Sequence, residues 1–264
     1  MSTSNAQRKR RKAQQAVISA RRGRRNRVSM IIGVVVVVVL AAAVIGGVLY
    51  QQHRKAEAAR EVIPVAHASG TYPTTVDRAG AIVLVGDGSA KVTVDAYEDF
   101  LCPICGQFEH ADFPDLEKHL AAGDVKVRYH LLNLLDDRSN PPGYSMNAAN
   151  TALAVATVVP EKFLDFHYSL YQKQPSENGP GWTQDQLTSL ANRLGVSGAE
   201  FDNLIQTKTY GRQIQQNLSA AENDKSLWQT SQQGSGFGTP TIVVNGKRVD
   251  WSQPGWLDKA VTAG

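Results

Sequence analysis

The sequence has 264 residues, enough for one large domain or two small ones, and its formal net charge of +4 is unevenly distributed. Residues 1–50 contain ten Lys and Arg but no Asp or Glu, whereas the rest of the chain contains 18 basic and 24 acidic residues. The folded part is therefore mildly acidic, and we expect no nucleic acid among its partners.

The basic tail, residues 1–27, is followed by an apolar segment at residues 28–50. Its centre, Ile31 to Leu49, is nineteen residues long and carries no charge. As a helix with a rise of ~1.5 Å per residue it would be about 28 Å long, which matches the hydrocarbon core of a bilayer. We therefore predict a single transmembrane helix at residues 28–50. The basic residues before it predict a cytoplasmic N-terminus, a tail that contacts anionic lipid, and an extracytoplasmic location for the remainder.

Two other interpretations of this region are weaker. A cleaved signal peptide usually has an apolar core of about 7 to 15 residues, and the candidate cleavage site at Val65–Ala68 lies far beyond the end of the apolar run. A nucleic-acid-binding arm would explain the basic tail but not the apolar segment. Residues 51–80 contain scattered Pro and Gly and little hydrophobic periodicity, so we interpret them as an extracytoplasmic tether without chemistry of its own.

After the tether, the residue pattern predicts one α/β domain at residues 81–264. Short runs rich in β-branched and other apolar residues predict strands at residues 81–85, 91–97 and 125–135. Both cysteines and a helix-like run lie between the second and third of these strands. The order of strand, CxxC at a helix start, and strand is typical of a thioredoxin-like redox motif.

The middle of this domain, at about residues 142–230, is predicted to be an all-helical insertion. Within it, "TQDQ" (Thr183–Gln186) and "SGAE" (Ser197–Glu200) both fit capping boxes at helix starts. After it, "TIVVNGKRVD" (Thr241–Asp250) has Asn-Gly between two strand-like runs, which predicts a hairpin. We expect a last helix at about residues 253–263.

The chemistry is predicted to lie in "DFLCPICGQFEH", residues 99–110. Proline is favoured at the first position of a helix, so Pro103 predicts that Cys102 is the N-cap. The Cys102 sulfur would then face unpaired backbone N–H groups at the positive end of the helix dipole, which should lower its pKa and make it a nucleophile. Cys105 lies one turn further along the same helix face, where it can resolve a mixed disulfide formed at Cys102.

Two other roles for the cysteine pair, and a different catalytic centre at Ser235, have less support in the sequence. A structural disulfide closing so short a loop would stabilise the fold little. A zinc site needs four ligands, but the chain has two cysteines and six histidines without paired spacing, so we expect no metal. A hydrolase centred on Ser235 lacks His and Asp partners recognisable in the sequence. Redox chemistry at Cys102 and Cys105 is the favoured interpretation, with their reversible disulfide as the redox group and no separate cofactor.

The strand before "DFLCPIC", the helical insertion and "GFGTPTIVVNG" (Gly236–Gly246) together resemble the DsbA-like branch of the thioredoxin superfamily, in its membrane-anchored bacterial form. The resemblance covers about residues 80–264. It implies an α/β fold, thioredoxin-like with an all-helical insertion, preceded by a single N-terminal transmembrane helix. It also implies that Pro240 follows a cis peptide bond opposite the cysteines, which would leave the Thr239 backbone free to pair with a substrate strand.

The resemblance implies an extracytoplasmic thiol-disulfide oxidoreductase that introduces disulfides into exported, cysteine-containing proteins. Its implied partner is a membrane reoxidase of the DsbB or VKOR type, and we expect a monomer. The same motif can run in reverse as a reductase or serve an isomerase, because redox potential and partner set the direction. An alternative from another class is an anchored, non-catalytic chaperone that binds peptides in the same groove, and metal or cofactor delivery is a third possibility.

The sequence departs from the family pattern in two places. Relatives often carry a buried acid six residues before the first cysteine, where this chain has Ala96; Glu98 and Asp99 are the candidates to replace it as a proton relay. The dipeptide between the cysteines, Pro103-Ile104, also lacks the histidine of the strongest oxidants in the family. Because Ile104 adds no positive charge near the thiolate, we expect a less extreme redox potential.

Overall fold

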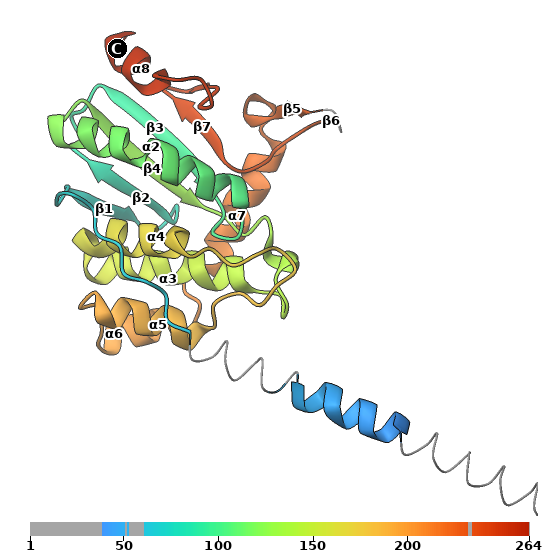
Figure 1. The fold of residues 1–264 in the computed structure, drawn as a ribbon. Coiled ribbons are helices and arrows are strands. Elements are labelled where there is room, and N and C mark those ends of the chain that lie inside the picture. Colours follow the sequence, from blue (N-terminus) through green and yellow to red (C-terminus); the bar gives the residue numbers. More distant parts are fainter. Residues whose placement is uncertain (1–38, 51, 53–60, 232–233, 264) are drawn as a thin grey trace, which may run out of the picture. The chain divides into compact units, whose positions relative to one another are not determined.

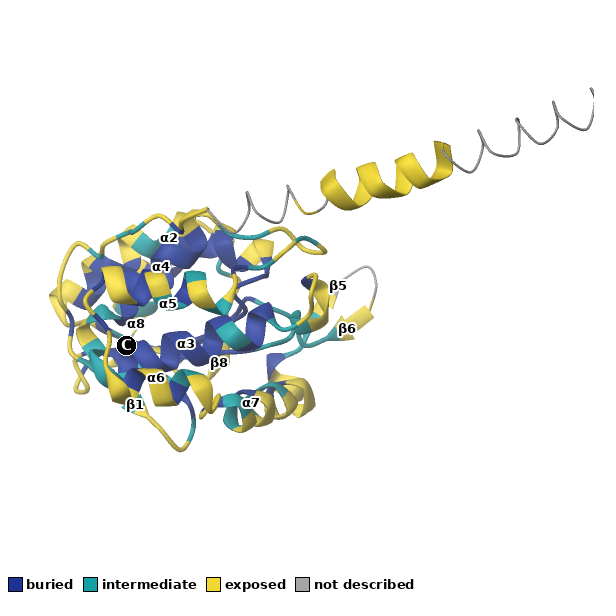
Figure 2. Ribbon diagram, turned by 90° about the horizontal axis from the view of Figure 1, so that it is seen from below, coloured by how far each residue is buried: buried dark blue, intermediate teal, exposed yellow. Residues whose placement is uncertain are grey.

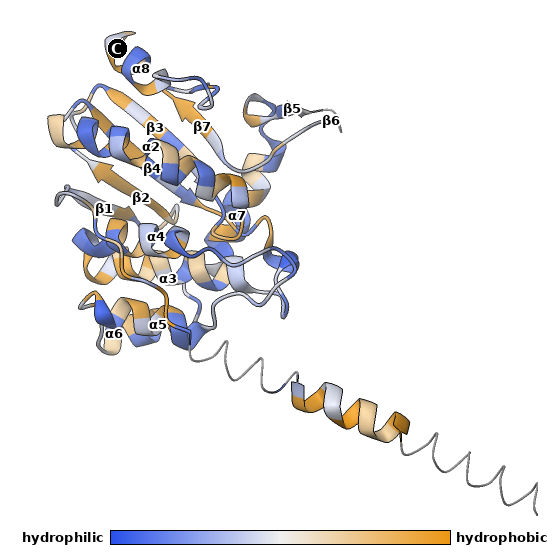
Figure 3. Cartoon of the chain, in the orientation of Figure 1, coloured by the Kyte–Doolittle hydropathy of each residue, from blue (hydrophilic) through white to orange (hydrophobic). Residues whose placement is uncertain are grey.

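The computed structural model describes residues 39–50, 52, 61–231 and 234–263. The chain divides into two compact units, Met1–Glu61 and Val62–Gly264. In the first unit, residues 39–50 form an exposed helix of mainly apolar residues (Figure 3). Residues 1–38, with the predicted basic tail and the first part of the predicted transmembrane segment, lie outside the described residues. Among the helices that the structure does describe, none combines the length and apolar character needed to cross a bilayer.

A six-stranded sheet forms the centre of the second unit (Figure 1). Its strands lie in the order β1-β2-β4-β3-β7-β8. Only the central neighbours β3 and β4 pair in parallel, and the other neighbouring pairs are antiparallel. The strands are β1 (Thr74–Asp77), β2 (Ile82–Gly86), β3 (Val92–Glu98), β4 (Val125–Leu131), β7 (Thr241–Val244) and β8 (Lys247–Arg248).

The parallel pairing of β3 and β4 determines where the helix that carries the two cysteines begins. Parallel strands need a crossover connection, and helix α2 (Pro103–Ala122) provides it between β3 and β4. Helix α2 packs on β2 and β4, and helix α8 (Trp256–Ala263) lies against it, because Trp256 Nε1 donates to Asp112 Oδ1 at 2.6 Å. The carboxyl end of β3 therefore delivers the two cysteines to one end of the sheet.

The helical insertion surrounds one buried helix, α3 (Tyr144–Val158), which contacts α4, α5, α6 and α7. Figure 2 shows α3 buried along most of its length. Its many alanines let the neighbouring helices approach closely, so a single short helix organises the layer. The other helices are α4 (Phe163–Gln172), α5 (Gln184–Arg193), α6 (Ala199–Gln206) and α7 (Gly211–Asn223), with 3-10 turns η1 (Asp136–Arg138), η2 (Pro160–Lys162) and η3 (Lys225–Leu227).

The two predicted capping boxes have different outcomes. Thr183 caps α5, and both reciprocal hydrogen bonds with Gln186 are present. The second prediction is wrong in position, because α6 begins one residue later than "SGAE" suggested and its N-cap is Gly198. Gly198 has φ of 112°, a conformation that glycine adopts without steric cost.

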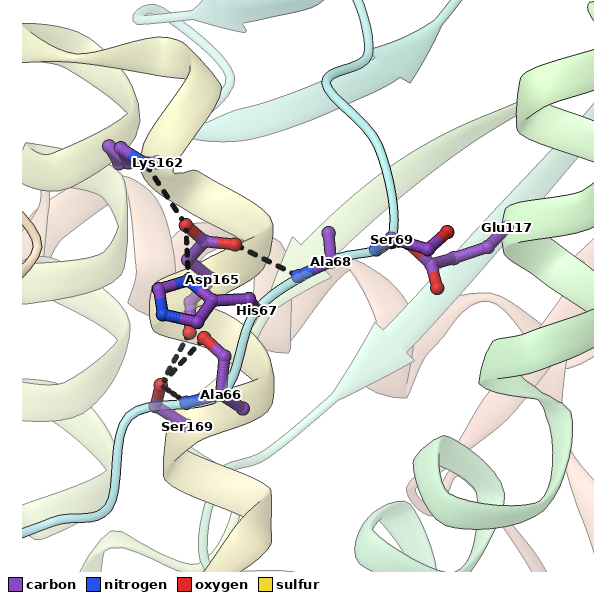
Figure 4. Close-up of polar contacts among 8 residues, drawn as sticks. All are labelled: Ala66, His67, Ala68, Ser69, Glu117, Lys162, Asp165 and Ser169. Carbon is purple, nitrogen blue, oxygen red and sulfur yellow. Dashed lines mark hydrogen bonds and ion pairs between the residues drawn. The ribbon is translucent and has the colours of Figure 1, made fainter.

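The predicted tether at residues 51–80 ends earlier than expected, since the second unit begins at Val62. Residues 66–68 lie against α4, and the chain bends at Ser69 (Figure 4). The backbone N–H of Ala66 donates to Ser169 Oγ at 2.8 Å, and that of Ala68 donates to Asp165 Oδ1 at 2.9 Å.

The same segment also reaches α2, where the Ser69 N–H donates to Glu117 Oε1. Ile63 is buried in the core cluster, and β1 extends the sheet by pairing with β2. The partners of this segment are side chains on distant helices, so its own composition did not reveal that it folds with the domain.

The C-terminal hairpin forms as predicted, with β7 and β8 joined by Asn245 (φ 48°) and Gly246 (φ 79°). A second small ribbon, β5 (Gln229–Ser231) with β6 (Gly234–Gly236), was not predicted. Its strands are three residues each, too short for a period-two pattern to be recognised. The ribbon leads directly into the loop that carries Pro240.

Candidate active site

Cys102 occupies the N-cap of α2, and Pro103 is the first helical residue, as the sequence predicts. The turn between β3 and α2 is held by side chains from outside the motif. Gln174, which follows α4, donates from Nε2 to the carbonyl oxygens of Phe100 (3.0 Å) and Cys102 (2.7 Å). The backbone at the cysteine is therefore fixed from the side of the helical insertion.

The second half of the site is the loop before β7. The Thr239–Pro240 peptide bond is cis, as expected. The Cys102 thiol donates to the Thr239 carbonyl oxygen at 3.2 Å, although the two residues are far apart in sequence. Gln229 Nε2 orients this loop by donating to the carbonyl oxygens of Gly238 and Pro240, both at 3.0 Å. The loop and the helix start thus face each other across the Cys102 sulfur.

The two thiols have opposite electrostatic environments. The S–H of Cys105, with help from the Ile104 and Cys105 backbone N–H groups, stabilises the Cys102 thiolate and lowers the Cys102 pKa to about 6 against the effect of burial. Burial, together with the negative charge at Cys102, raises the pKa of Cys105 well above its usual value. Cys105 is 0% exposed, while Ile104 beside it is 44% exposed. Cys102 itself is 6% exposed. Cys102 is therefore the more readily ionised, nucleophilic sulfur, and Cys105 is a protonated, fully enclosed thiol.

The two candidate acids, Glu98 and Asp99, are both buried but differ in their partners. Asp99 accepts hydrogen bonds from the Leu101 N–H (2.8 Å), the Leu135 N–H (2.8 Å) and the Ser145 hydroxyl (2.6 Å). Burial raises its pKa to about 7 although these donors oppose the effect. For Glu98, no described residue donates a hydrogen bond to either carboxylate oxygen. Asp99 therefore holds the turn together, whereas Glu98 keeps its oxygens available.

Glu98 belongs to a buried cluster with Glu109 of α2 and His167 of α4. His167 Nε2 lies 3.4 Å from Glu98 Oε2 and 3.2 Å from Glu109 Oε1. Among the described residues, these three are the group whose nitrogen and oxygen atoms, all within 4.8 Å of one another, have a spacing compatible with a metal ion. One imidazolium and one ionised carboxylate balance each other if the second carboxyl is protonated, so the cluster is neutral without an ion.

Comparison with known proteins gives the family. A family model described as thioredoxin matches residues 78–261. The chain belongs to the thioredoxin family. The reduced disulfide bond oxidoreductase DsbG from Mycobacterium tuberculosis is similar, with 34% identity, 68% of this chain and 82% of that chain covered, and a TM-score of 0.56. Reduced DsbA from the same organism has 31% identity, coverage of 74% and 92%, and a TM-score of 0.56.

Within the thioredoxin family the chain is thus one of the DsbA-like thiol-disulfide oxidoreductases. A further similar protein is the serine/threonine-protein kinase PknE of Mycobacterium tuberculosis, 28% identical over 183 residues. The match covers 68% of this chain but only 31% of that kinase, so this chain corresponds to about a third of its length.

This thioredoxin-family structure brings together the predicted residues Cys102, Cys105, Thr239 and Pro240 in one site. It also adds residues that sequence reasoning missed. Glu109 carried a weak signal, because it stands four positions after Cys105 on the same helix and so shares its face. No pattern in the sequence indicated a role for Gln174, Gln229 or His167, because each reaches the site from a distant part of the chain.

Proposed function

We propose that this protein catalyses thiol-disulfide exchange at Cys102 and Cys105, and that its physiological direction is the oxidation of exported proteins. The observation that supports this proposal most directly is the combination of a Cys102 pKa lowered to about 6 with an enclosed Cys105 thiol one helical turn further along. A low-pKa cysteine is a good leaving group and makes the dithiol form stable, which favours electron acceptance from substrates.

The exchange needs only the cysteine pair. A substrate thiolate attacks Cys102 Sγ, the bond between Cys102 and Cys105 breaks, and its electron pair goes to Cys105 Sγ. A second substrate thiolate then attacks the substrate sulfur of the mixed disulfide and releases the Cys102 thiolate. The substrate loses two electrons and the enzyme gains them, so the reversible disulfide is the redox group and no further cofactor or metal is required.

Substrate positioning is assigned to the loop around the cis bond. The Thr239 backbone lies beside Cys102 and offers polar groups to an extended substrate segment, in the manner of strand addition. Pro103 starts the helix that stabilises the thiolate, and Ile104 is an exposed apolar side chain next to it that can contact the substrate. Of the two candidate acids, Glu98 is the proposed proton relay to Cys105, because its oxygens are not occupied by other donors.

The proposed location is the cell membrane, with the catalytic domain outside the cytoplasm. The basis is the sequence: an uncharged run at Ile31–Leu49 after a tail of ten basic residues that is suited to anionic lipid. The proposed partners are cysteine-containing exported proteins and a membrane reoxidase of the DsbB or VKOR type. The protein is proposed to act as a monomer and to bind no nucleic acid.

The equilibrium potential of the Cys102/Cys105 couple, titrated against glutathione in the full-length chain, tests the direction. We expect a value clearly above the roughly −270 mV typical of thioredoxins, and catalysed oxidation of a reduced, unfolded substrate protein. A potential as low as that of thioredoxins would reassign the protein as an extracytoplasmic reductase. Unchanged activity in Cys102→Ser would instead identify a non-catalytic peptide-binding chaperone.

A further inference from the structure

The cluster of Glu98, Glu109 and His167 joins three parts of the fold beneath Cys105. Glu98 ends β3, Glu109 lies in α2 one helical turn beyond Cys105, and His167 comes from α4 in the helical insertion. Their side chains are 0%, 1% and 0% exposed. Placing two carboxylates and an imidazole in the interior is costly unless their charges balance.

Within the described part of the chain, these groups have one another as charged partners. Among the residues that the structure describes, neither oxygen of either glutamate and neither nitrogen of His167 has a hydrogen bond that satisfies both distance and direction. His167 Nε2 lies between the two carboxylates, at 3.2 Å from Glu109 and 3.4 Å from Glu98. A single imidazolium can balance one carboxylate, so the other carboxyl must hold a proton for the cluster to be neutral.

We propose that Glu109 and His167 form an ion pair that keeps Glu98 as a protonated acid beneath Cys105, and that Glu98 donates this proton to Cys105 when the active-site disulfide is reduced. This inference rests on the proposed exchange at the cysteine pair. Glu109 and His167 act through Glu98, so they are positioning residues. The helical insertion thereby supplies part of the proton chemistry of the redox site.

The charges around the cluster support this assignment of the proton. Burial and the neighbouring Glu109 charge raise the Glu98 pKa to about 8, so its carboxyl is protonated at neutral pH. Burial alone would lower the His167 pKa, but Glu109 and Glu98 raise it to about 9, so the imidazolium is charged. When Glu98 is ionised, its negative charge raises the pKa of Cys105, so the two groups are close enough to interact electrostatically.

The tyrosines that face the cluster supply no competing charge at neutral pH. Burial raises the pKa of each surrounding tyrosine well above its usual value, so these phenols stay neutral. Burial also raises the pKa of Asp99 to about 7, and it raises the pKa of Asp112 above its usual value. The facing groups are Asp99 directly after β3, Cys105 and Asp112 on α2, Tyr129 on β4, and Tyr168 and Tyr171 on α4.

The proton that Glu98 donates neutralises the sulfur that receives the electron pair. When a substrate thiolate attacks Cys102 Sγ, Cys105 Sγ receives the electron pair of the broken sulfur–sulfur bond and takes the proton from Glu98. In the reverse direction, Cys105 returns its proton to the Glu98 carboxylate as its sulfur attacks the mixed disulfide. Glu109 and His167 keep their charges in both directions.

The test is the pH dependence of disulfide reduction in the full-length chain by a small dithiol, with rates corrected for the thiolate fraction of that reagent. We expect the wild-type rate to fall above about pH 8, where Glu98 loses its proton. In Glu109→Gln the imidazolium can pair with Glu98 instead, so the descending limb of the pH–rate profile should move down by at least about one pH unit, and the rate at pH 7 should fall by at least about twofold. In Glu98→Gln the limb should disappear.

His119→Gln is the matched control, because His119 also lies between two carboxylates, Asp124 and Asp258, but in the last turn of α2. It should keep the wild-type profile. An unmoved limb in Glu109→Gln, with wild-type exchange intact, would overturn this inference but not the proposed function. Absence of exchange in the wild type would overturn the proposed function itself.

Two measurements on the wild-type chain keep the inference testable if Glu109→Gln does not fold. Nuclear magnetic resonance of labelled histidine should show a charged His167 imidazolium at pH 7 in both the oxidised and the reduced chain, and a neutral ring would overturn the assignment. Elemental analysis after incubation with Zn²⁺ or Mn²⁺ should find no stoichiometric metal at the cluster. One bound ion per chain, lost in Glu98→Gln, would identify a metal site instead.

Discussion

The two ends of helix α2 use the same residue types to different effect. Near its start, His167 lies between Glu98 and Glu109, whose side chains are 0% and 1% exposed. At its other end, His119 lies between Asp124 and Asp258, whose side chains are 45% and 57% exposed. Both places hold one histidine and two carboxylates, and they differ in access to water.

The difference in hydration reverses the effect on the acids. At the exposed end, the hydrogen bond from His119 lowers the pKa of Asp258, so this carboxyl stays ionised. At the enclosed end, burial raises the pKa of Glu98 to about 8, so this carboxyl holds a proton at neutral pH. The environment, rather than the choice of residues, makes one end suitable for proton exchange and the other for fastening α8 to α2.

The largest predicted effect is on the rate of disulfide transfer, which should depend on the start of α2 and not on its end. Cys102→Ser should lower the rate of disulfide transfer by more than about a thousandfold, because no other residue replaces the nucleophile. His119→Gln should leave that rate within about twofold while costing about 1 kcal/mol of unfolding free energy, because it removes partly buried hydrogen bonds to Asp124 and Asp258. Transfer assays and thermal unfolding of both variants measure this. A large loss of transfer in a folded His119→Gln would contradict the division of roles.

The next prediction concerns stability and pH at the active end. The folded-state pKa of Cys102 is lowered from 9.0 to about 6, so its stabilising effect is present above pH 9 and is lost as the pH falls through about 6. Glu98 and His167 act in the opposite sense, because their pKa values are raised to about 8 and about 9, and their contribution is lost as the pH rises through those values.

Subtracting the unfolding free energy of Cys102→Ser from that of the reduced wild type isolates the thiol, because the other groups are common to both proteins. The difference should grow by up to about 4 kcal/mol between pH 6 and 9, at ~1.4 kcal/mol per pKa unit. Denaturant titrations at several pH values under reducing conditions provide the data. A flat difference would show that the Cys102 thiolate is not stabilised by the fold.

A smaller effect is predicted for the reactivity of Cys102. Its alkylation rate by iodoacetamide should rise with pH with a midpoint near 6. Cys105→Ala removes the S–H that donates to the thiolate, which should move the midpoint up by about one pH unit, the equivalent of one hydrogen bond to a charged group. An unchanged midpoint would assign the stabilisation to the helix start alone.

The smallest predicted effects compare one glycine at each end of α2. Gly123 is the C-cap with φ of 76° and has open space around it, so Gly123→Ala should cost about 1 kcal/mol of stability and leave transfer unchanged. At Gly106 an added Cβ would lie 2.6 Å from Gln174 Oε1, the side chain that holds the Cys102 carbonyl. Gly106→Ala should therefore alter alkylation of Cys102 more than stability, which thermal unfolding and alkylation rates together would show.

Much of the fold was predictable where neighbouring residues decide the outcome. Pro103 indicated the start of α2, Thr183 with Gln186 indicated the start of α5, and Asn245-Gly246 indicated the hairpin. The errors arose where distant contacts decide. Residues 62–80 looked like a spacer, yet Ala66 and Ala68 are held by side chains of α4.

The sequence by itself determined the chemistry of the nucleophile. The order of the cysteines, the proline between them and the strand before them are local features, and a helix start stabilises a thiolate whatever surrounds it. Only the tertiary structure decided which acid faces Cys105 without other donors, and which residues hold its proton. Glu98 and Asp99 are adjacent in the chain, but Ser145 and Leu135 occupy one while His167 and Glu109 surround the other. Burial and charge balance depend on contacts between distant segments, which no local pattern records.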